Sequence, residues 1–316
     1  MAFEYEEGKG ILFRFVEDNP EYTILSDTDI DGIFAASMIA RALDADVSRI
    51  SYPKPSEIDS IKASRSILIE LPLSKGLTYI GNNVLIDHHG PAPLIALYSG
   101  PKKVREILFN SGLRSVSRLV FNVFSGLLVL NDEGSRILEA VDEIDSGSIV
   151  SELAVKMNKA FLLNSMKEDA RANLTRMIYG SEWDKILEWV ESELNRWSLV
   201  ENRIEKLKGS VGKTGIVTYF TYDVTDQLEA AARRMLMLQL SKGENVVVCI
   251  GLKKGRPVSA TIAARSLDLN RVYAELLKNE GVKAGGRANI GGIQFKQEIG
   301  LEDALNLIRR ALEGSG

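Results

Sequence analysis

The sequence predicts an α/β protein in which a mostly parallel sheet with flanking helices is joined by a helical connector to a smaller α/β domain. Short apolar runs alternate with helical stretches in the first half, which is the pattern of a parallel sheet. The length of 316 residues exceeds that of one ordinary domain. Glycines in residues 209–215 interrupt the chain before a second series of strands. We therefore expect domains at residues 1–165 and 210–316, with the connector at residues 166–209.

Composition and charge limit the class of protein. Hydrophobic residues make up 45% and charged residues 26%, as in a soluble globular protein, and the net charge of −4 argues against a generally basic nucleic-acid binder. Cys249, the single cysteine, lies in an apolar run and is expected to be a buried, inert thiol, which favours a reducing compartment. No apolar stretch has the length of a membrane span, and the first residues do not resemble a signal peptide. We expect a cytoplasmic protein that does not enter membranes.

The strands of the first domain are expected at residues 21–26, 48–52, 67–71 and 83–87. A helix is expected at residues 32–43, directly after the first strand. Residues 101–163 have a helical period, with helices expected at 114–130 and 133–144. Since ligands collect at the carboxyl ends of parallel strands, the residues that follow each strand are the candidates for a functional site.

An acidic loop follows the first strand. Asp27, Asp29 and Asp31 lie within five residues and would repel one another unless a cation or hydrogen-bond donors hold them. Helix capping is the alternative, but it needs one aspartate and uses a second for the helix dipole, which leaves the third unexplained. The loop therefore favours a divalent metal.

Both histidines of the chain stand together at the end of the fourth strand, in Asp87-His88-His89. Imidazole and carboxylate groups bind manganese, iron or zinc, and a neutral histidine also serves as an acid or base near neutral pH. A pair of histidines that only caps a strand is the alternative interpretation. Glu70 ends another apolar run, where an unpaired carboxylate would be costly and a metal would relieve it.

The connector carries Trp183, Trp189 and Trp197 among aliphatic residues, a pattern more typical of a packing face than of a base-stacking platform. In the second domain, strands are expected at residues 215–222, 245–252 and 257–264, and helices at 226–240 and 270–280.

A glycine-rich segment closes the second domain. Gly285, Gly286, Gly291 and Gly292 would let the backbone approach a ligand closely, and Arg287 between them could clamp a phosphate. Arg265 is a second candidate for a phosphate contact. The alternative for the glycine pairs is a flexible hairpin.

Several of these features together resemble the DHH phosphoesterase family, which includes RecJ-like exonucleases and nanoRNases. The features are Asp27-x-Asp29-x-Asp31-Gly32, the strand ending at Glu70, Asp87-His88-His89, Asp145 after a helix end, and Gly285-Gly286-Arg287 with Gly291-Gly292. The resemblance covers nearly the whole chain and implies a DHH domain followed by a DHH-associated domain. It also implies Mn²⁺ as cofactor, as one or two ions and with Mg²⁺ as the substitute. The implied reaction is hydrolysis of phosphodiester bonds in single-stranded DNA, short RNA or a small nucleotide by metal-activated water.

The resemblance also implies roles for individual residues. The metal ligands would be Asp27, Asp29, Glu70, Asp87, His88 and Asp145. The catalytic histidines would be His88 and His89, of which His89 would orient the substrate or stabilise developing charge. The substrate-binding residues would be Arg265, Arg287, Gly285, Gly286, Gly291 and Gly292.

Three departures from the family pattern favour an alternative function. Residues 23–26 contain no histidine before the acidic loop, Glu70 stands in place of an aspartate, and Arg287 stands in place of a histidine. The alternative is a catalytically degenerate DHH-fold protein that binds a replication-protein partner of the GINS or helicase type. A ligand-binding protein with a structural cation is a third interpretation.

Overall fold

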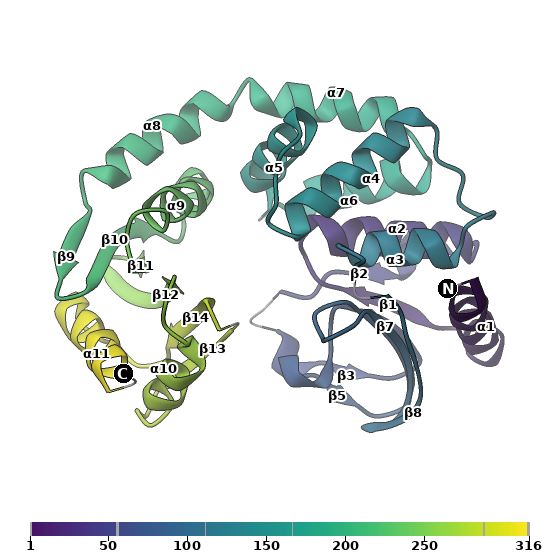
Figure 1. Ribbon diagram of the computed structural model, residues 1–316, viewed down its shortest axis with the longest axis horizontal. Coiled ribbons are helices and arrows are strands. Elements are labelled where there is room, and N and C mark those ends of the chain that lie inside the picture. The colour runs from purple at the N-terminus through teal and green to yellow at the C-terminus, as the bar shows by residue number, and fades with distance from the viewer. Residues whose placement is uncertain (1, 55–56, 111, 166, 287, 315–316) are drawn as a thin grey trace. The chain divides into compact units, whose positions relative to one another are not determined.

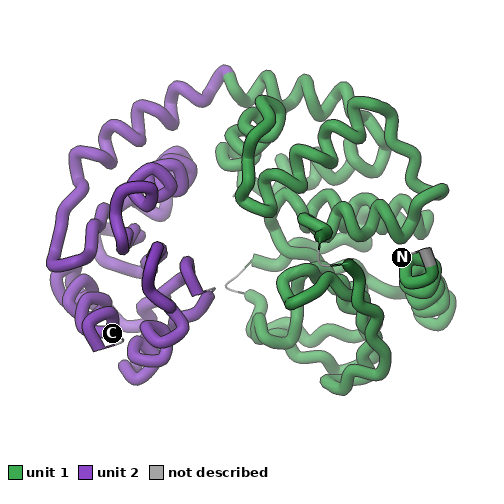
Figure 2. The backbone as a smooth tube through the Cα atoms, viewed as in Figure 1, with its two compact units in different colours: residues 1–194 green, residues 195–316 purple. Residues whose placement is uncertain are grey.

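The computed structural model describes residues 2–54, 57–110, 112–165, 167–286 and 288–314. Its contacts divide the chain into two compact units, residues 1–194 and 195–316 (Figure 2). The boundary falls between the helices α7 (Trp183–Leu194) and α8 (Trp197–Lys208), inside the stretch for which the sequence predicts a helical connector. Trp183 and Trp197 are both buried, which agrees with a packing face.

The first unit is built on a six-stranded sheet with the order β2-β1-β4-β6-β7-β8 (Figure 1). The strands are β1 (Thr23–Ser26), β2 (Ile50–Ser51), β4 (Ser66–Ile69), β6 (Asn82–Asp87), β7 (Leu94–Ser99) and β8 (Lys102–Leu108). The first four pair in parallel and the last two are antiparallel. A small separate sheet pairs β3 (Lys62–Ala63) with β5 (Thr78–Tyr79). The mostly parallel sheet is the one that the sequence predicts.

The helical period predicted from residue 101 is wrong for β8, which is an exposed edge strand. Lysine, arginine and glutamate occupy most of this strand, and these residues suit a helix as well as a solvated strand edge. A turn at Gly100, whose φ is +57°, folds β8 back onto β7, so pairing with the neighbour decides the conformation. The helix predicted at 114–130 is likewise shorter, since α3 (Val116–Val123) ends before Gly126, whose φ is +92°.

One face of the parallel strands packs against the small β3–β5 sheet, and the other face is covered by helices. They are α1 (Ala2–Asp18), α2 (Ile30–Ala42), α3, α4 (Asp132–Asp145), α5 (Glu152–Asn164), α6 (Glu168–Tyr179) and α7, with 3₁₀ turns η1 (Val47–Arg49), η2 (Ile58–Ser60) and η3 (Leu73–Lys75). Helix α2 is buried from Ile30 to Ala40 and packs against α3 and α6. Because α2 is apolar on all sides, it forms the centre of the core and fixes the loop that precedes it.

The second unit has its own six-stranded sheet, with the order β13-β14-β12-β11-β10-β9. Its elements are α8, β9 (Gly212–Thr214), β10 (Val217–Asp223), α9 (Gln227–Leu240), β11 (Val246–Lys253), β12 (Arg256–Ala264), α10 (Leu269–Leu276), β13 (Val282–Gly286), β14 (Ile290–Phe295) and α11 (Leu301–Glu313). Cys249 is fully buried in β11, and burial raises the pKa of its thiol to about 12, as expected for an inert cysteine.

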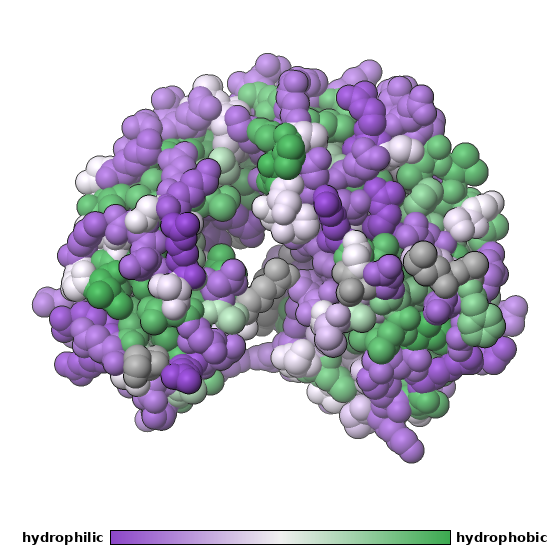
Figure 3. All heavy atoms as spheres, in the orientation of Figure 1, coloured by the Kyte–Doolittle hydropathy of each residue, from purple (hydrophilic) through white to green (hydrophobic). Residues whose placement is uncertain are grey.

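Figure 3 shows hydrophilic residues over much of the displayed face of both units, with hydrophobic residues interspersed. Among the described residues, no helix combines the length and the apolar character of a membrane span.

Candidate metal centre

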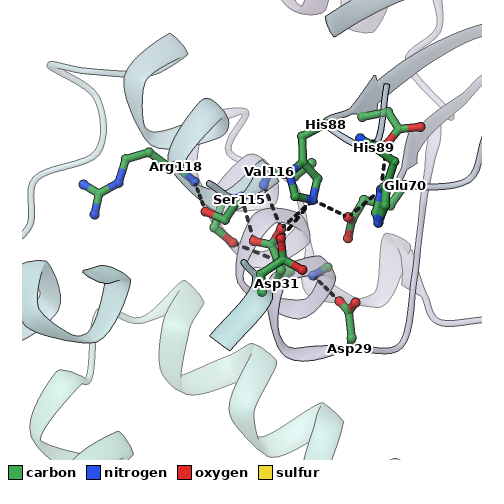
Figure 4. A network of polar contacts seen from close by, with 12 residues as sticks. Asp29, Asp31, Glu70, His88, His89, Ser115, Val116 and Arg118 are labelled. Carbon is green, nitrogen blue, oxygen red and sulfur yellow. Dashed lines mark hydrogen bonds and ion pairs between the residues drawn. The ribbon is translucent and has the colours of Figure 1, made fainter. Parts of the chain in front are cut away.

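Four side chains converge at the carboxyl edge of the parallel strands (Figure 4). Asp31 lies in the first turn of α2, Glu70 follows β4, His88 follows β6, and Asp145 is the last residue of α4. One potential ligand atom from each lies within 4.8 Å of those of the other three. We call these four residues the acidic-histidine cluster. Its members come from distant parts of the sequence, and the parallel order of the strands brings them to one edge.

His88 lies within 4 Å of all three other members of the cluster. Its Nε2 lies 3.0 Å from Asp145 Oδ2, 3.1 Å from Glu70 Oε1 and 3.9 Å from Asp31 Oδ2. Burial lowers the pKa of His88, but the hydrogen bonds and negative charges of Asp145 and Glu70 outweigh it and raise this pKa to about 10. Without a metal, a proton on His88 balances part of the negative charge of the cluster.

Glu70 is fully buried, and neither of its carboxylate oxygens has a hydrogen-bond partner of proper geometry among the described residues. Burial, and then the charge of Asp29, raise its pKa well above the usual value. Its φ of +56° is a left-handed conformation that costs a non-glycine residue about 1–2 kcal/mol. The Glu70 amide donates to the carbonyl of Ile86 at 2.9 Å, which holds this turn in place.

The chemistry of these residues fits a divalent cation. Glu70 Oε1 and Oε2, His88 Nε2 and Asp145 Oδ2 are buried and make no hydrogen bond of proper geometry, although His88 Nε2 lies within ion-pair distance of both carboxylates. Buried polar atoms are normally satisfied, so their concentration at one place indicates an absent partner. Three carboxylates and one imidazole form a ligand set suited to Mn²⁺, and carboxylates suit Mg²⁺ as well.

Asp31 is the cluster residue that the predicted ligand set lacks. Its carboxylate is fully buried and accepts hydrogen bonds from the backbone amides of Val116 at 2.7 Å and Ser117 at 2.8 Å, at the start of α3 (Figure 4). Burial, and then the charge of Asp145, raise its pKa to about 7. The signal in the sequence was the third aspartate of the loop, which helix capping leaves unexplained.

The first two aspartates of the loop have partners within the chain. Asp29 is the N-cap of α2 and accepts from the Gly32 amide at 2.8 Å, so the capping interpretation holds for this residue. Burial, and then the charge of Asp27, raise the pKa of Asp29 to about 6. Asp27 Oδ2 lies 2.5 Å from Lys75 Nζ. Gly32 permits this tight loop, because a Cβ there would lie 2.6 Å from the Asp27 carbonyl oxygen.

Asp87 and His89 form a second pair beside the cluster. Asp87 Oδ1 accepts from the His89 amide at 3.0 Å and lies 2.9 Å from His89 Nδ1. His89 Nδ1 also lies 3.3 Å from Glu70 Oε1, and its ring packs edge-on against that of His88, 4.6 Å between centroids. The side chain of His89 is 29% exposed, whereas that of His88 is 10% exposed, so a ligand can reach His89. Of the predicted ligand set, Glu70, His88 and Asp145 lie in the cluster, whereas Asp27, Asp29 and Asp87 lie outside it.

The predicted substrate-binding glycines pair across the β13–β14 hairpin, Gly285 with Gly292 and Gly286 with Gly291. A Cβ on Gly286 or Gly291 would collide with the opposite backbone or with Tyr273, whereas one on Gly285 or Gly292 would meet nothing within 4 Å. The inner pair is thus required by packing, and the outer pair is open to a ligand.

The two predicted substrate-binding arginines are Arg265 and Arg287. The Arg265 guanidinium is exposed and donates to the carbonyl oxygen of Lys242 at 3.1 Å. Arg287 lies outside the described residues.

Comparison with known proteins relates this geometry to solved structures. The pGpG-specific phosphodiesterase PggH of Vibrio cholerae superposes with a TM-score of 0.57 and 17% identity, over 93% of this chain and 100% of that one. RecJ of Thermus thermophilus in complex with Mn²⁺ superposes with a TM-score of 0.61 and 12% identity, over 98% of this chain and 54% of that one. An exonuclease RecJ bound to manganese gives a TM-score of 0.55 at 12% identity, over 98% of this chain and 93% of that one.

No family model matches this sequence, and no curated protein matches it. At these identities the structural likeness establishes the fold, which is that of the DHH phosphoesterases. The resemblance predicted from the sequence and the predicted α/β fold class are thereby confirmed at the level of the fold. The chain spans about half of the Thermus RecJ chain and the whole of the PggH chain.

Proposed function

We propose that the protein is a metal-dependent phosphodiesterase that uses Mn²⁺, with Mg²⁺ as a substitute. Its substrates would be single-stranded DNA, short RNA or a small nucleotide. The observation that carries this proposal is the acidic-histidine cluster, in which Glu70, His88 and Asp145 bring together buried atoms that make no hydrogen bond of proper geometry. Support comes from the structural similarity to the pGpG-specific phosphodiesterase PggH and to the manganese-bound exonuclease RecJ. The buried single thiol of Cys249 suits a cytoplasmic location.

The residues that would hold the cation are Asp31, Glu70, His88 and Asp145. A cation bound there supplies Lewis-acid stabilisation of a phosphoryl oxygen and lowers the pKa of a coordinated water. His88 must be neutral to serve as a ligand, so the proton that Asp145 and Glu70 hold on its Nε2 has to leave. Asp31 is anchored by two amides of α3, which fixes its carboxylate before any ligand arrives.

His89 is placed to act on the substrate. Asp87 accepts from Nδ1 and fixes the orientation of the ring, which leaves Nε2 on the opposite side to face the substrate. In this role the imidazolium form of His89, which has a proton on both ring nitrogens, would donate from Nε2 to the scissile phosphate and stabilise the negative charge that develops there. Asp87 is then a positioning residue for His89, in addition to the ligand role that the family resemblance implies.

The substrate-binding residues that the family resemblance implies all belong to the second unit. Arg265, Arg287 and the open glycines Gly285 and Gly292 offer guanidinium and backbone groups suited to phosphate oxygens. Such contacts hold a nucleic-acid backbone without reading its sequence.

The alternative, a degenerate DHH-fold binding partner of the replication machinery, has its own supporting observation. Ser26 precedes the acidic loop, where the family resemblance leads us to expect a histidine, and its buried Oγ donates to the carbonyl of Gly32 at 2.8 Å. Among the described residues, the candidate metal groups share Glu70 and His88, so they amount to one centre. A single centre fits either a one-ion enzyme or a protein that has lost its activity.

The deciding experiment measures hydrolysis of end-labelled single-stranded DNA and RNA oligomers and of linear and cyclic dinucleotides, with Mn²⁺, Mg²⁺ or EDTA. The test variant is Asp145→Asn, and the matched control is Asp132→Asn at the exposed start of the same helix. We expect metal-dependent turnover that the control retains and Asp145→Asn loses. Absence of turnover on every substrate by folded, metal-loaded protein would refute the enzyme and favour the replication-partner function, which co-purification then examines.

A further inference from the structure

The first unit contains a cavity of about 510 Å³ that none of the cluster residues lines. It lies at the carboxyl end of the edge strand β2 and against α6, and its polar lining includes Ser48, Ser51, Tyr52, Arg171, Thr175 and Arg176. Its volume is within the range of small-molecule sites. Because β2 pairs with β1, the cavity opens on the same edge of the sheet as the acidic loop.

Arg171 is the unusual residue of this cavity. It is only 6% exposed, and its Nη1 donates to the carbonyl oxygen of Ser165 at 2.7 Å. Among the described residues, no carboxylate lies within ion-pair distance of its guanidinium. A largely buried guanidinium normally has an anionic partner at contact distance, and here the charge of Arg171 reaches the carboxylate of Glu168 only at longer range. An anion bound in the cavity would provide such a partner.

The acids that also line the cavity are already engaged. Glu168 lies 2.8 Å from the Lys54 ammonium, and Glu57 Oε2 accepts from the Lys54 amide at 3.1 Å. Arg176 follows Arg171 on the same helix, and it too lacks an ion pair within the described part of the chain. The charge of Arg171 also acts on Glu168, but the lining holds three cations, Lys54, Arg171 and Arg176, against the two acids, so a net positive charge remains for a ligand.

Hydroxyl groups complete the lining. The Tyr52 hydroxyl and Thr175 Oγ1 lie 2.8 Å apart, and Thr175 is only 4% exposed. Ser48 and Ser51 add two more hydroxyls. Guanidinium forks with neutral hydroxyl donors are the groups that bind the oxygens of a phosphate.

We propose that this cavity binds the phosphate group of a nucleotide, with Arg171 and Arg176 as its cationic contacts. The ligand is a free mononucleotide or a nucleotide of a longer strand, since both present the same phosphate. The choice of a nucleotide as the carrier of this phosphate rests on the proposed function, whereas binding here requires neither the metal nor hydrolysis.

Isothermal titration calorimetry of the full chain in EDTA tests this site without the metal centre. The ligands are inorganic phosphate, a mononucleotide, the corresponding nucleoside, and oligonucleotides with and without a terminal phosphate. We expect the mononucleotide to bind and the nucleoside not to bind. Arg176→Gln, at an exposed position, should weaken binding about tenfold, the effect of losing one charge-assisted contact. Arg171→Lys should weaken it as well, because the fork geometry is lost.

Arg136→Gln, at an exposed position on α4, is the matched control and should bind as the wild type does. Binding of oligonucleotides alone, lost in Arg176→Gln, would identify the ligand as part of a strand. Failure of every phosphate-bearing ligand to bind, or equal affinity in wild type and Arg176→Gln, would overturn the proposal. Either result leaves the hydrolysis experiment unaffected.

Discussion

The Lys75 ammonium lies 2.5 Å from Asp27 Oδ2, so a cation of the chain itself balances the first aspartate of the acidic loop. Lys75 ends η3, only a few residues after Glu70. The buried Leu71 anchors this segment, and its carbonyl accepts from the Tyr79 hydroxyl at 2.7 Å. Asp27 thus has a cationic partner within the chain, and its role as a metal ligand stays a prediction.

Removal of Lys75 should change the number of metal ions. We expect wild-type protein to bind one Mn²⁺ tightly, and Lys75→Met to accept a second, weaker ion, because Asp27 would then carry an unbalanced charge beside Asp29. Calorimetric titration and the electron paramagnetic resonance spectrum of Mn²⁺ measure the stoichiometry. Lys62→Met, at an exposed position, is the control. Two tightly bound ions in the wild type would contradict this prediction.

Metal should stabilise the first unit strongly. A cation at one hundred times its Kd adds about 2.7 kcal/mol to the free energy of unfolding. We expect Glu70→Gln to raise the melting temperature in EDTA, since it removes a fully buried carboxylate whose charged form is disfavoured by burial and by the charge of Asp29, and to reduce the increase caused by Mn²⁺. Differential scanning calorimetry with Mn²⁺ and with EDTA measures both effects. The exposed Glu302→Gln should change neither, and an unchanged Mn²⁺ shift in Glu70→Gln would exclude Glu70 as a ligand.

The metal-free protein should lose stability as the pH rises. The pKa of Asp31 is raised from 3.8 to about 7, so its native form keeps a proton that the unfolded chain releases. The stabilisation is complete below the unfolded pKa and is lost as the pH rises through about 7. The pKa of His88 is raised from 6.5 to about 10, so its contribution is present below 6.5 and declines up to about 10.

Thermal unfolding in EDTA across this pH range checks the sign. His88→Gln should flatten the decline above neutral pH. A melting temperature that rises with pH in the metal-free wild type would show that the cluster is not protonated in this way.

Asp31 should have a structural role that is separate from its charge. Asp31→Ala leaves the amides of Val116 and Ser117 without an acceptor inside the protein, which costs about 1–3 kcal/mol for an unsatisfied buried group. Asp31→Asn removes the same charge but keeps one acceptor oxygen, so we expect it to be more stable than Asp31→Ala. Urea unfolding in EDTA compares the two variants directly. Equal stabilities would mean that the hydrogen bonds to α3 contribute nothing.

Substitutions at two glycines of the β13–β14 hairpin should have different effects, one on folding and the other on substrate binding. A Cβ on Gly291 would lie 2.1 Å from the Tyr273 hydroxyl, so Gly291→Ala should lower the melting temperature. Gly292→Ala meets no neighbour within 4 Å and should fold normally while weakening the binding of nucleotide substrate. Melting curves and KM for the hydrolysed substrate test the pair. Normal KM in Gly292→Ala would place the substrate elsewhere.

The sequence by itself determined the α/β class, the parallel strands and the strand ends at which acidic residues and histidines lie. Apolar runs that end in Glu70 or in Asp87-His88-His89 are local patterns, and the parallel order of strands follows from their alternation with helices. The pairing of the glycines in a hairpin is equally local. These features need no knowledge of distant contacts.

Only the tertiary structure decided which carboxylates meet. The position of Asp31 in the cluster depends on α3, which supplies two amides to Asp31, and the ion pair of Asp27 depends on η3, which brings Lys75 to it. The strand β8 depends in the same way on its neighbour β7. The physical reason is that the role of a charged side chain depends on the hydrogen-bond donors, the cations and the low-dielectric surroundings beside it. Long-range packing brings these groups together, and the spacing of residues along the sequence does not reveal them.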